Sequence, residues 1–497
     1  YFEAIAKALT KDNAQVLVLL PEIALTTQWL DRFEARFGAR PTEWHSDLGQ
    51  AERRRAWRSV IAGEARIVVG ARSALFLPFR HLGLIVVDEE HDPSFKQEEG
   101  VPYQARDMAV VRAQLADCPV ILSSATLSYE TLFNIDRGRY GKVTLEKRFG
   151  GAELPEVSGI DMREEKLPAE RWLSGKLVET LKQTLGRGEQ AMLFLNRRGY
   201  APLTLCRTCG TRIECPDCTA WLVEHRLKRR LMCHHCGHSI AKPEHCPECG
   251  DTESLAVCGP GVERLEEEVA KLFPSAKRLV MTSDTMTSPA KAAEMVARIA
   301  SGRTDIIIGT QVITKGYHFP KLTLVGVIDA DLGLKGGDLR AAERTFQQME
   351  QVSGRAGREE LKGHVYLQTY MPENPVMAAL LSGEKPRFIK EDMGQRNLYG
   401  MPPYGRLAAV ILSGSKPHPV EDFAHQLARR FPKAEGVQLF GPAQAYLARL
   451  KAQYRYRLLI KAGRNVALQK VIRSWMKDVK IPASVKVKID IDPYSFL

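Results

Sequence analysis

Short, continuous apolar runs alternate with segments of helical periodicity along most of this 497-residue chain. Four runs lie in the first 140 residues, at 15–21, 65–71, 82–88 and 118–125. Five more follow, at 190–196, 276–282, 305–310, 322–331 and 363–369. Strands that are apolar on both faces and separated by helices are typical of parallel sheets covered by helices on both sides. The sequence therefore predicts an α/β protein with two such sheets.

Eight of the ten cysteines interrupt the second set of runs as four C-x-x-C pairs. The pairs are Cys206/Cys209, Cys215/Cys218, Cys233/Cys236 and Cys246/Cys249. Two thiolates separated by two residues can face one ion, and two such turns form a tetrahedral structural zinc site. Loop lengths favour two nested zinc sites, one bound by the second and third pairs and the other by the first and fourth. Disulfides are the alternative, and this clustering argues against them.

Adjacent carboxylates follow the buried run at 82–88, where Asp88 and Glu89 end a strand. Open α/β sheets bind ligands at the carboxyl ends of their strands. In nucleotide hydrolases such an Asp orients Mg²⁺ and the next carboxylate positions the attacking water. Small hydroxyl residues at 123–126 end the next strand and can couple this site to a neighbouring lobe. The sequence predicts an ATP site with Mg²⁺ here, although no G-x-x-x-x-G-K-[ST] loop occurs in the chain.

A second half of that site is predicted at 351–358, QVSGRAGR, which supplies Gln351, Arg355 and Arg358. A glycine directly precedes each arginine, and glycines so spaced form tight turns from which guanidinium groups can project toward an anion. An arginine that reaches across a lobe boundary onto a γ-phosphate stabilises the charge of the transition state.

The net charge of +12 is concentrated in residues 401–497, which carry 17 Lys and Arg against 6 Asp and Glu. A basic module suggests a polyanionic partner, and an ordinary solvated surface is the alternative. Basic residues alternate with tyrosines at 449–464, so we expect Arg455, Tyr456 and Arg457 to contact DNA. Alternation at period two also fits a half-buried strand with its tyrosines in the core.

Further motifs accompany these residues in a fixed order. They are LLPEIALTTQ at 19–28, GARSALFLPF at 70–79, DEEHDPSFKQEEGVPYQARD at 88–107, FLNRRGYAP at 194–202, IIIGTQVITKGYHFP at 306–320 and DADLGL at 329–334. With QVSGRAGR after them, the chain resembles the primosomal replication-restart helicases, the PriA family of helicase superfamily 2. The resemblance extends from the first residue to the last.

This resemblance implies two RecA-like helicase lobes with an inserted two-zinc cysteine module and a small α+β C-terminal domain. The expected boundaries are 1–140 for lobe 1, 141–168 for a connector, 169–205 with 259–400 for lobe 2, 206–258 for the zinc module and 401–497 for the basic DNA- and partner-binding domain.

The implied activity is that of an ATP-dependent 3′-to-5′ DNA helicase that recognises abandoned replication forks and initiates primosome assembly. The implied partners are forked and single-stranded DNA, single-stranded-DNA-binding protein, other primosome proteins and the replicative helicase loader. The family is bacterial, cytoplasmic and associated with the nucleoid. No apolar run approaches the roughly 20 residues of a membrane span.

The resemblance also assigns residues to ligands. Gly316 is expected at the nucleotide together with Asp88, Glu89, Arg355 and Arg358. Superfamily 2 motors hold one strand through its phosphates across both lobes. The expected lobe contacts to DNA are Thr26, Arg72, Thr310 and Lys315.

In this family a phosphate-binding G-S-G-K-T-E-x-Y motif precedes the first helix, and its final Tyr corresponds to Tyr1. We therefore expect the chain to be a fragment whose phosphate-binding lysine and N-terminal DNA-binding domains lie upstream, so that it binds ATP poorly and does not hydrolyse it alone. The alternative function is a DNA- and partner-binding scaffold with a vestigial motor.

Overall fold

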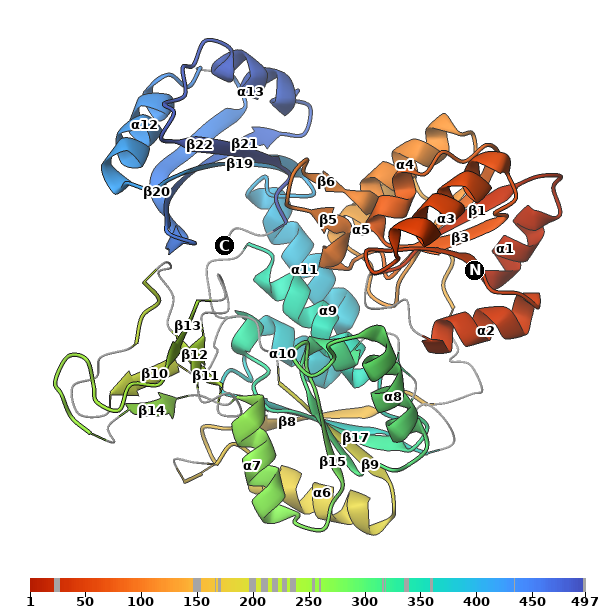
Figure 1. Ribbon diagram of the computed structural model, residues 1–497, viewed down its shortest axis with the longest axis vertical. Helices are drawn as coiled ribbons and strands as arrows, with labels where there is room; N and C mark the ends of the chain where they lie inside the picture. The colour runs from red at the N-terminus through yellow and green to blue at the C-terminus, as the bar shows by residue number, and fades with distance from the viewer. Residues whose placement is uncertain are drawn as a thin grey trace.

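A computed structural model describes the chain except for residues 22–26, 146–152, 166, 169–170, 196–202, 207–212, 217–221, 226–229, 233–237, 253–254, 259–260, 315–316, 318, 335–338, 358–360, 433 and 495–497. Figure 1 shows four bodies: an N-terminal lobe, a second lobe below it, a small sheet at one side of the second lobe, and a C-terminal domain above. Helices α9 and α11 lie between them.

Lobe 1 contains a five-stranded parallel sheet in the order β2-β3-β1-β4-β7. Its strands are β1 (Gln15–Leu19), β2 (Thr42–Trp44), β3 (Ile67–Gly70), β4 (Leu82–Asp88) and β7 (Val120–Ser123). Its helices are α1 (Phe2–Leu9), α2 (Thr27–Phe37), α3 (Gln50–Ala62), α4 (Ala105–Leu115) and α5 (Tyr129–Asp136). Every residue of the central strand β1 is buried, because helices cover both faces of the sheet. The prediction of a parallel sheet from continuous apolar runs is confirmed.

Lobe 2 contains a six-stranded parallel sheet in the order β15-β16-β9-β17-β18-β8. Its strands are β8 (Glu156–Asp161), β9 (Gln190–Phe194), β15 (Arg278–Met281), β16 (Ile306–Gly309), β17 (Leu322–Val327) and β18 (His364–Thr369). Its helices are α6 (Gly175–Gly186), α7 (Val262–Leu272), α8 (Pro289–Ala300), α9 (Ala341–Ser353), α10 (Pro375–Ser382) and α11 (Lys385–Leu398).

The expected connector at 141–168 contributes one of these strands, β8, which pairs with β18 along six residues. The reading of this whole segment as a connector was wrong at β8. An edge strand buries little of its surface, and β8 has only one fully buried residue, Ile160. Its composition therefore resembles that of a loop.

The other two sheets are antiparallel. The cysteine-rich region forms β13-β12-β11-β10-β14, from β10 (Leu203–Cys206), β11 (Val223–His225), β12 (Arg230–Met232), β13 (Ser239–Ala241) and β14 (Leu255–Cys258). The C-terminal domain forms β20-β21-β19-β22, from β19 (Gly405–Gly414), β20 (Val437–Leu450), β21 (Gln453–Gly463) and β22 (Lys486–Ile491). Helices α12 (Pro417–Arg429) and α13 (Leu468–Met476) share one apolar core with this sheet, as an α+β domain requires.

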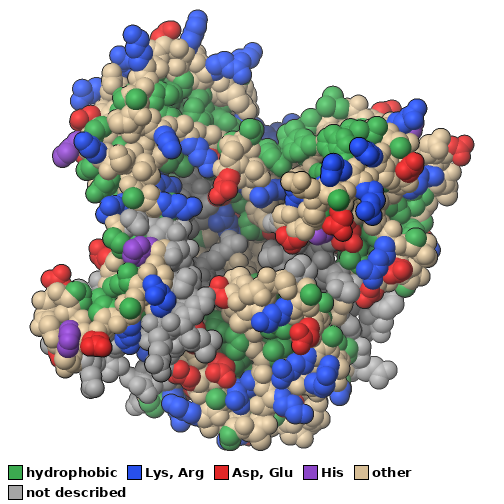
Figure 2. All heavy atoms as spheres, viewed as in Figure 1, with side chains coloured by type: hydrophobic (Ala, Val, Ile, Leu, Met, Phe, Trp, Pro, Cys, Tyr) green, Lys and Arg blue, Asp and Glu red, His purple; other side chains and the backbone are tan. Residues whose placement is uncertain are grey.

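Apolar side chains gather on the outer surface of lobe 1, over α3 and α4 (Figure 2). The exposed large apolar side chains of these two helices are Trp57, Ile61, Val111 and Leu115. None of the described helices has the length and apolar character needed to cross a membrane.

A glycine closes the equivalent strand in each lobe. Gly70 ends β3 and Gly309 ends β16, and a 3-10 helix follows each of them. A Cβ at either position would lie against a carbonyl of the neighbouring strand, 2.3 Å from that of Trp44 or 2.5 Å from that of Met281. The two lobes thus repeat one strand-to-turn geometry that requires glycine.

We expect Gly309→Ala to lower the free energy of unfolding by about 2 kcal/mol, because there is no space for the added methyl group beside the Met281 carbonyl. Chemical unfolding measures this loss. Gly175→Ala is the matched control, because a Cβ at the start of α6 meets nothing within 4 Å. An equal effect of the two substitutions would contradict the steric explanation.

Candidate nucleotide site between the two lobes

The predicted carboxylates lie at the carboxyl end of β4, at the edge of the lobe 1 sheet. The Tyr1 hydroxyl donates to Asp88 Oδ2 at 2.9 Å, and the Glu89 amide donates to Asp88 Oδ1 at 3.0 Å. The Trp29 indole in turn donates to the Tyr1 hydroxyl at 2.9 Å. Glu89 has a φ of 51°, which residues other than glycine seldom adopt. Such constrained backbone is common at functional sites.

The two adjacent glutamates have different environments. Glu90 is completely buried and accepts hydrogen bonds from the Ser128 amide and hydroxyl, the Thr131 hydroxyl and the Arg106 guanidinium. With its acceptor positions occupied, Glu90 joins β4 to α4 and α5. Glu89 instead faces lobe 2, where Gln351 Nε2 donates to its Oε2 at 3.4 Å.

Burial raises the pKa of the Glu89 carboxyl, and the nearby charge of Asp88 raises it further. Arg355 opposes this rise, and so does His91 when its ring is protonated, because positive charge favours the ionised carboxylate. A carboxyl with a raised pKa accepts a proton more readily near neutral pH. Glu89, rather than Glu90, therefore has the environment of a general base.

His91 connects both lobes to the acidic strand end. Its Nδ1 lies 2.8 Å from Ser124 Oγ and its Nε2 lies 2.9 Å from Gln351 Nε2. The Ser124 hydroxyl donates to the Thr126 carbonyl, so it accepts from His91. An amide nitrogen can only donate, so His91 Nε2 is the acceptor. In the neutral ring these directions place the imidazole proton on Nδ1. Ser124 is thus linked to Gln351 of lobe 2 through His91, and a coupling role for residues 123–126 stays a prediction.

One face of α9 lies against lobe 1 along the whole helix. Arg340, its N-cap, donates to Glu130 at 2.6 Å, and Glu343 accepts from the Tyr129 amide at 3.1 Å. Gln347 donates to the Leu127 carbonyl at 3.2 Å, and Gln351 completes the series at Glu89 and His91. Spacings of three, four and four residues place these side chains on one face of a helix.

Arg355 lies just beyond α9, and its guanidinium is buried and donates to the Tyr317 carbonyl at 2.6 Å. Its charge acts on Glu89 across the lobe boundary, since it is one of the causes that lower the pKa of that carboxyl. The structure thus brings together Asp88, Glu89, Gln351 and Arg355. The two remaining candidates, Arg358 and Gly316, lie outside the described residues.

The expected DNA contacts have mixed outcomes. Thr26 and Lys315 lie outside the described residues. Arg72 donates to the carbonyls of Ser94 and Lys96 at 2.8 and 3.1 Å, which braces the loop after the acidic strand end. Thr310 is buried, so that only 6% of its surface is open to solvent or to a DNA strand.

In the C-terminal domain, Arg455 and Arg457 are half-buried in β21. Tyr456 between them is buried in the core of the sheet, and Gln444 donates to its hydroxyl. The expectation that Tyr456 contacts DNA was wrong, because the alternation along β21 turns its ring inward. The alternative reading of a half-buried strand describes it correctly.

The cysteine-rich region is described in part. Of the eight paired cysteines, the structure describes the side chains of Cys215, Cys246 and Cys249. Cys206 ends β10, and Cys209, Cys218, Cys233 and Cys236 lie outside the described residues. Within the part that is described, no three potential ligand side chains converge. Cys246 begins a turn in which the Gly250 amide donates to its carbonyl at 2.9 Å, and such a turn fits a C-x-x-C zinc knuckle.

Several residues at the site received no role from sequence. His91 and Tyr1 were quoted only as parts of motifs, although each contacts a predicted carboxylate. Their proximity depends on the sheet order, which places the N-terminus of α1 beside β4, and spacing along the chain does not report it.

The comparisons with known proteins agree with this arrangement. The DEAD/DEAH box helicase domain matches residues 1–135, and the helicase conserved C-terminal domain matches 244–360. The Cys-rich region domain of PriA DNA helicase matches 215–240, and the primosomal protein N C-terminal domain matches 397–494.

Replication restart protein PriA of Rickettsia conorii is 48% identical over all of this chain and 76% of its own length. The Bacillus subtilis protein of that name is 40% identical over all of this chain and 62% of its own length. Among solved structures, the DUF1998 helicase MrfA bound to DNA has a TM-score of 0.46 at 13% identity, over 79% of this chain and 47% of that one.

We expect Glu89→Gln and Glu90→Gln to change stability in opposite directions. Glu89→Gln removes a carboxylate whose charged form burial disfavours, so the free energy of unfolding rises near neutral pH. Glu90→Gln removes the buried carboxylate that pairs with Arg106 and accepts from Ser128 and Thr131, although Arg106 keeps Asp107 and Glu130 nearby, so we expect a loss of about 2 kcal/mol. Denaturant titration of both variants measures the two changes.

The pH dependence of the Glu89→Gln effect follows from the raised pKa. The folded wild-type protein holds the Glu89 proton more tightly than the unfolded chain, so this group stabilises the fold at low pH and loses that contribution as the pH rises through its folded pKa. The advantage of the variant should therefore be absent near ~pH 4 and present near ~pH 8. The reverse trend would contradict the assigned environment.

Proposed function

The chain belongs to the PriA family of replication restart proteins, and we propose that the contact of Gln351 with Glu89 and His91 forms the ATP-hydrolysing site of a 3′-to-5′ DNA helicase. Family membership makes it an ATP-dependent DNA helicase that acts in replication restart. The single observation that carries the site is that side chains of both lobes meet at the end of β4. Nucleotide hydrolysis at a lobe boundary is how such a motor links chemistry to movement.

Each residue of this site has a distinct role in the proposal. Asp88 would bind Mg²⁺, which supplies positive charge to the phosphates of bound ATP. Glu89 orients the attacking water and accepts its proton. Gln351, from the other lobe, holds the Glu89 and His91 side chains in position. Arg355 and Arg358 stabilise negative charge on the phosphates, and Gly316 allows close approach of the nucleotide to the backbone.

The proposal for DNA binding rests on charge and position. Arg72, Thr310, Thr26 and Lys315 contact phosphates of one strand in the two lobes, and Arg455 and Arg457 add contacts from the C-terminal domain. Arg72 also braces residues 94–96, so loss of its side chain would disturb the loop after the acidic strand end as well as any DNA contact. Contacts to phosphates alone leave unwinding independent of sequence.

Two structural zinc ions are proposed for the cysteine-rich region, and the strand register supports the nested pairing. Cys206 pairs with Leu255 at one end of the β10–β14 ladder, and the turn of Cys246 and Cys249 precedes β14 in the chain. Met232, directly before Cys233, pairs with Val223, five residues after Cys218. The first and fourth cysteine pairs thus adjoin one end of the β10–β14 ladder. The second and third cysteine pairs likewise adjoin one end of the β11–β12 ladder. Four thiolates leave zinc no open position, so its role is to fold this region.

The proposed partners follow the family. Forked DNA, single-stranded-DNA-binding protein, other primosome proteins and the replicative helicase loader would bind, with the basic domain from residue 401 to 497 as the principal surface. Lobe 1 is assigned to residues 1–140 and the zinc module to 206–258. Lobe 2 is assigned to 169–205 and 259–400 together with the edge strand β8, which pairs with β18. The scaffold alternative is not favoured, because the chain matches both helicase domains and PriA relatives over its whole length. The contact of Gln351 with Glu89 and His91 across the lobe boundary also fits a working motor.

The decisive experiment is a DNA-stimulated ATPase assay on the full-length protein. We expect Asp88→Ala to lower kcat by at least ~100-fold, because it removes several kcal/mol of metal-dependent stabilisation. Asp12→Ala is the matched control, since Asp12 is exposed and precedes the opposite end of the lobe 1 sheet. The wild type should unwind a duplex with a 3′ tail and not one with a 5′ tail. Full activity of Asp88→Ala would exclude the assigned role.

Metal analysis tests the zinc proposal. We expect two zinc equivalents per chain, and one fewer in Cys215→Ser and in Cys246→Ser, because each removes a thiolate from a different site. Cys118→Ser should keep both, because Cys118 lies outside the module and burial raises the pKa of its thiol. A content of one equivalent in the wild type would refute the nested arrangement.

A further inference from the structure

The end of the C-terminal domain reaches the loop that follows the acidic strand end. The Lys96 ammonium donates to Asp490 Oδ1 at 2.7 Å and to the carbonyls of Ile491 and Asp492 at 3.1 and 3.3 Å. The Lys96 and Asp490 side chains are only 3% and 9% exposed. A buried ion pair with further hydrogen bonds holds its geometry closely. Residues 490–492 are therefore anchored to lobe 1 only five residues after His91.

Tyr494 extends this segment into the boundary between the lobes. Its hydroxyl donates to the His91 carbonyl at 3.3 Å, and its side chain is almost completely buried. The Arg340 and Arg344 guanidinium groups lie 4.7 and 5.3 Å from its ring centroid, within the range of cation–π attraction. One side chain thus touches both the acidic strand end of lobe 1 and the start of α9.

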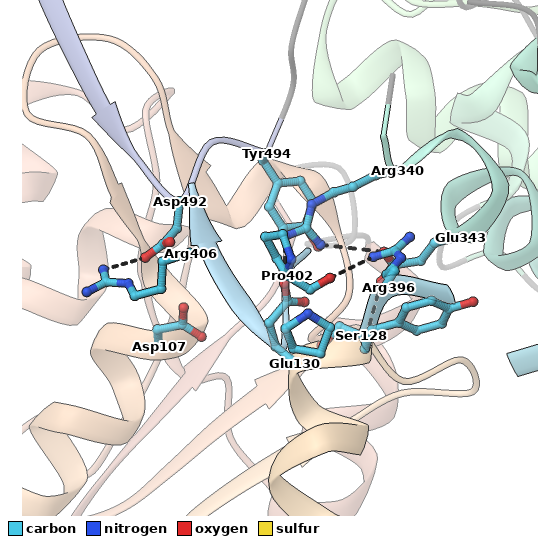
Figure 3. A network of polar contacts seen from close by, with 12 residues as sticks. Asp107, Ser128, Glu130, Arg340, Glu343, Arg396, Pro402, Arg406, Asp492 and Tyr494 are labelled. Carbon is cyan, nitrogen blue, oxygen red and sulfur yellow. Dashed lines mark hydrogen bonds and ion pairs between the residues drawn. The ribbon is translucent and has the colours of Figure 1, made fainter. Parts of the chain in front are cut away.

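A buried ionic network surrounds Tyr494, and Figure 3 shows its ring among Arg340, Glu130 and Glu343. Arg340 pairs with Glu130 at 2.6 Å and with Glu343 at 3.5 Å, and Arg396 of α11 pairs with Glu343 at 2.9 Å. Burial raises the pKa of the Tyr494 hydroxyl, which keeps it protonated and able to donate. These contacts therefore fix the start of α9 relative to lobe 1, to the C-terminal segment and to α11 of its own lobe.

We propose that Tyr494 is a positioning residue for ATP hydrolysis, which holds the backbone of His91 against the start of α9 so that Gln351 meets Glu89 and His91. The inference rests on the proposed function of that site. Arg340 and Gln351 are eleven residues apart, or about 16 Å along a helix. A small tilt at the start of α9 therefore displaces Gln351 at its other end.

The consequence is a direct path from the C-terminal domain to the catalytic carboxylates. Asp492 also pairs with Arg406 at 2.7 Å, and its amide donates to the Leu407 carbonyl, so the segment is tied to β19. A ligand that shifts the C-terminal sheet would shift Tyr494 with it. The domain proposed to bind DNA and protein partners thus controls the alignment of the ATPase site.

The test compares Tyr494→Phe and Tyr494→Ala in the full-length protein by DNA-stimulated ATPase kinetics. Tyr494→Phe keeps the ring between the arginines and loses one hydrogen bond, so we expect kcat to fall by about 5-fold. Tyr494→Ala loses both contacts, and we expect a fall of at least ~10-fold. The KM for ATP should change little, because Tyr494 contacts no residue assigned to phosphate.

Two controls separate positioning from general stability. Trp475→Phe removes an indole donor to the Leu427 carbonyl in the core of the same domain and touches neither lobe. We expect it to lower the unfolding midpoint and leave kcat unchanged. In a Gln351→Ala background, Tyr494→Phe should have no additional effect on kcat, since it acts through Gln351.

The possible outcomes distinguish the two proposals. A wild-type protein without DNA-stimulated ATPase activity overturns the proposed function and this inference with it. An active wild type whose kcat falls equally in Tyr494→Phe and Trp475→Phe, or whose Tyr494 and Gln351 effects multiply independently, overturns the inference alone. Tyr494→Phe retains the ring, so the test stands even where Tyr494→Ala fails to fold.

Discussion

The placement of one face of α9 against lobe 1 is the interaction on which the rest of the site depends. Four side chains of that face, Arg340, Glu343, Gln347 and Gln351, reach lobe 1 residues from Glu130 to Glu89. Because the helix is rigid, contacts at its start and at its end cannot move independently. A movement of lobe 2 that is transmitted along α9 therefore changes the surroundings of Glu89, the carboxylate proposed as the general base.

Much of this interface consists of buried polar groups, and removing such groups from water costs free energy. Ion pairs removed from water gain little net stability, because desolvation offsets their attraction. Their value here is geometric, because Glu343 accepts from the Tyr129 amide of lobe 1 and at the same time pairs with Arg340 and Arg396. An interface of hydrogen-bonded polar groups has one good register and can separate without exposing a large apolar surface. Both properties suit a motor whose lobes open and close.

The adjacent glutamates show how the same chemistry acquires two roles from its surroundings. Glu90 is enclosed by donors and stabilises lobe 1, whereas Glu89 projects into the lobe boundary with a raised pKa. The backbone turn at Glu89 separates them, because a positive φ redirects the chain directly after the strand. The C-terminal domain then adds a third body to the same place through Lys96 and Tyr494.

The sequence by itself determined the two parallel sheets, the cysteine-rich insertion and the identity of the acidic and arginine motifs, because strand burial and motif spacing are local properties of a chain. The sequence did not predict the edge strand β8, because an edge strand buries too little of its surface to need a continuous apolar run. Only the tertiary structure decided which glutamate faces the other lobe, that Tyr456 points inward, and that His91, Gln351 and Tyr494 meet. Those contacts join residues up to 403 positions apart, and their geometry depends on sheet order and helix orientation, which no local pattern encodes.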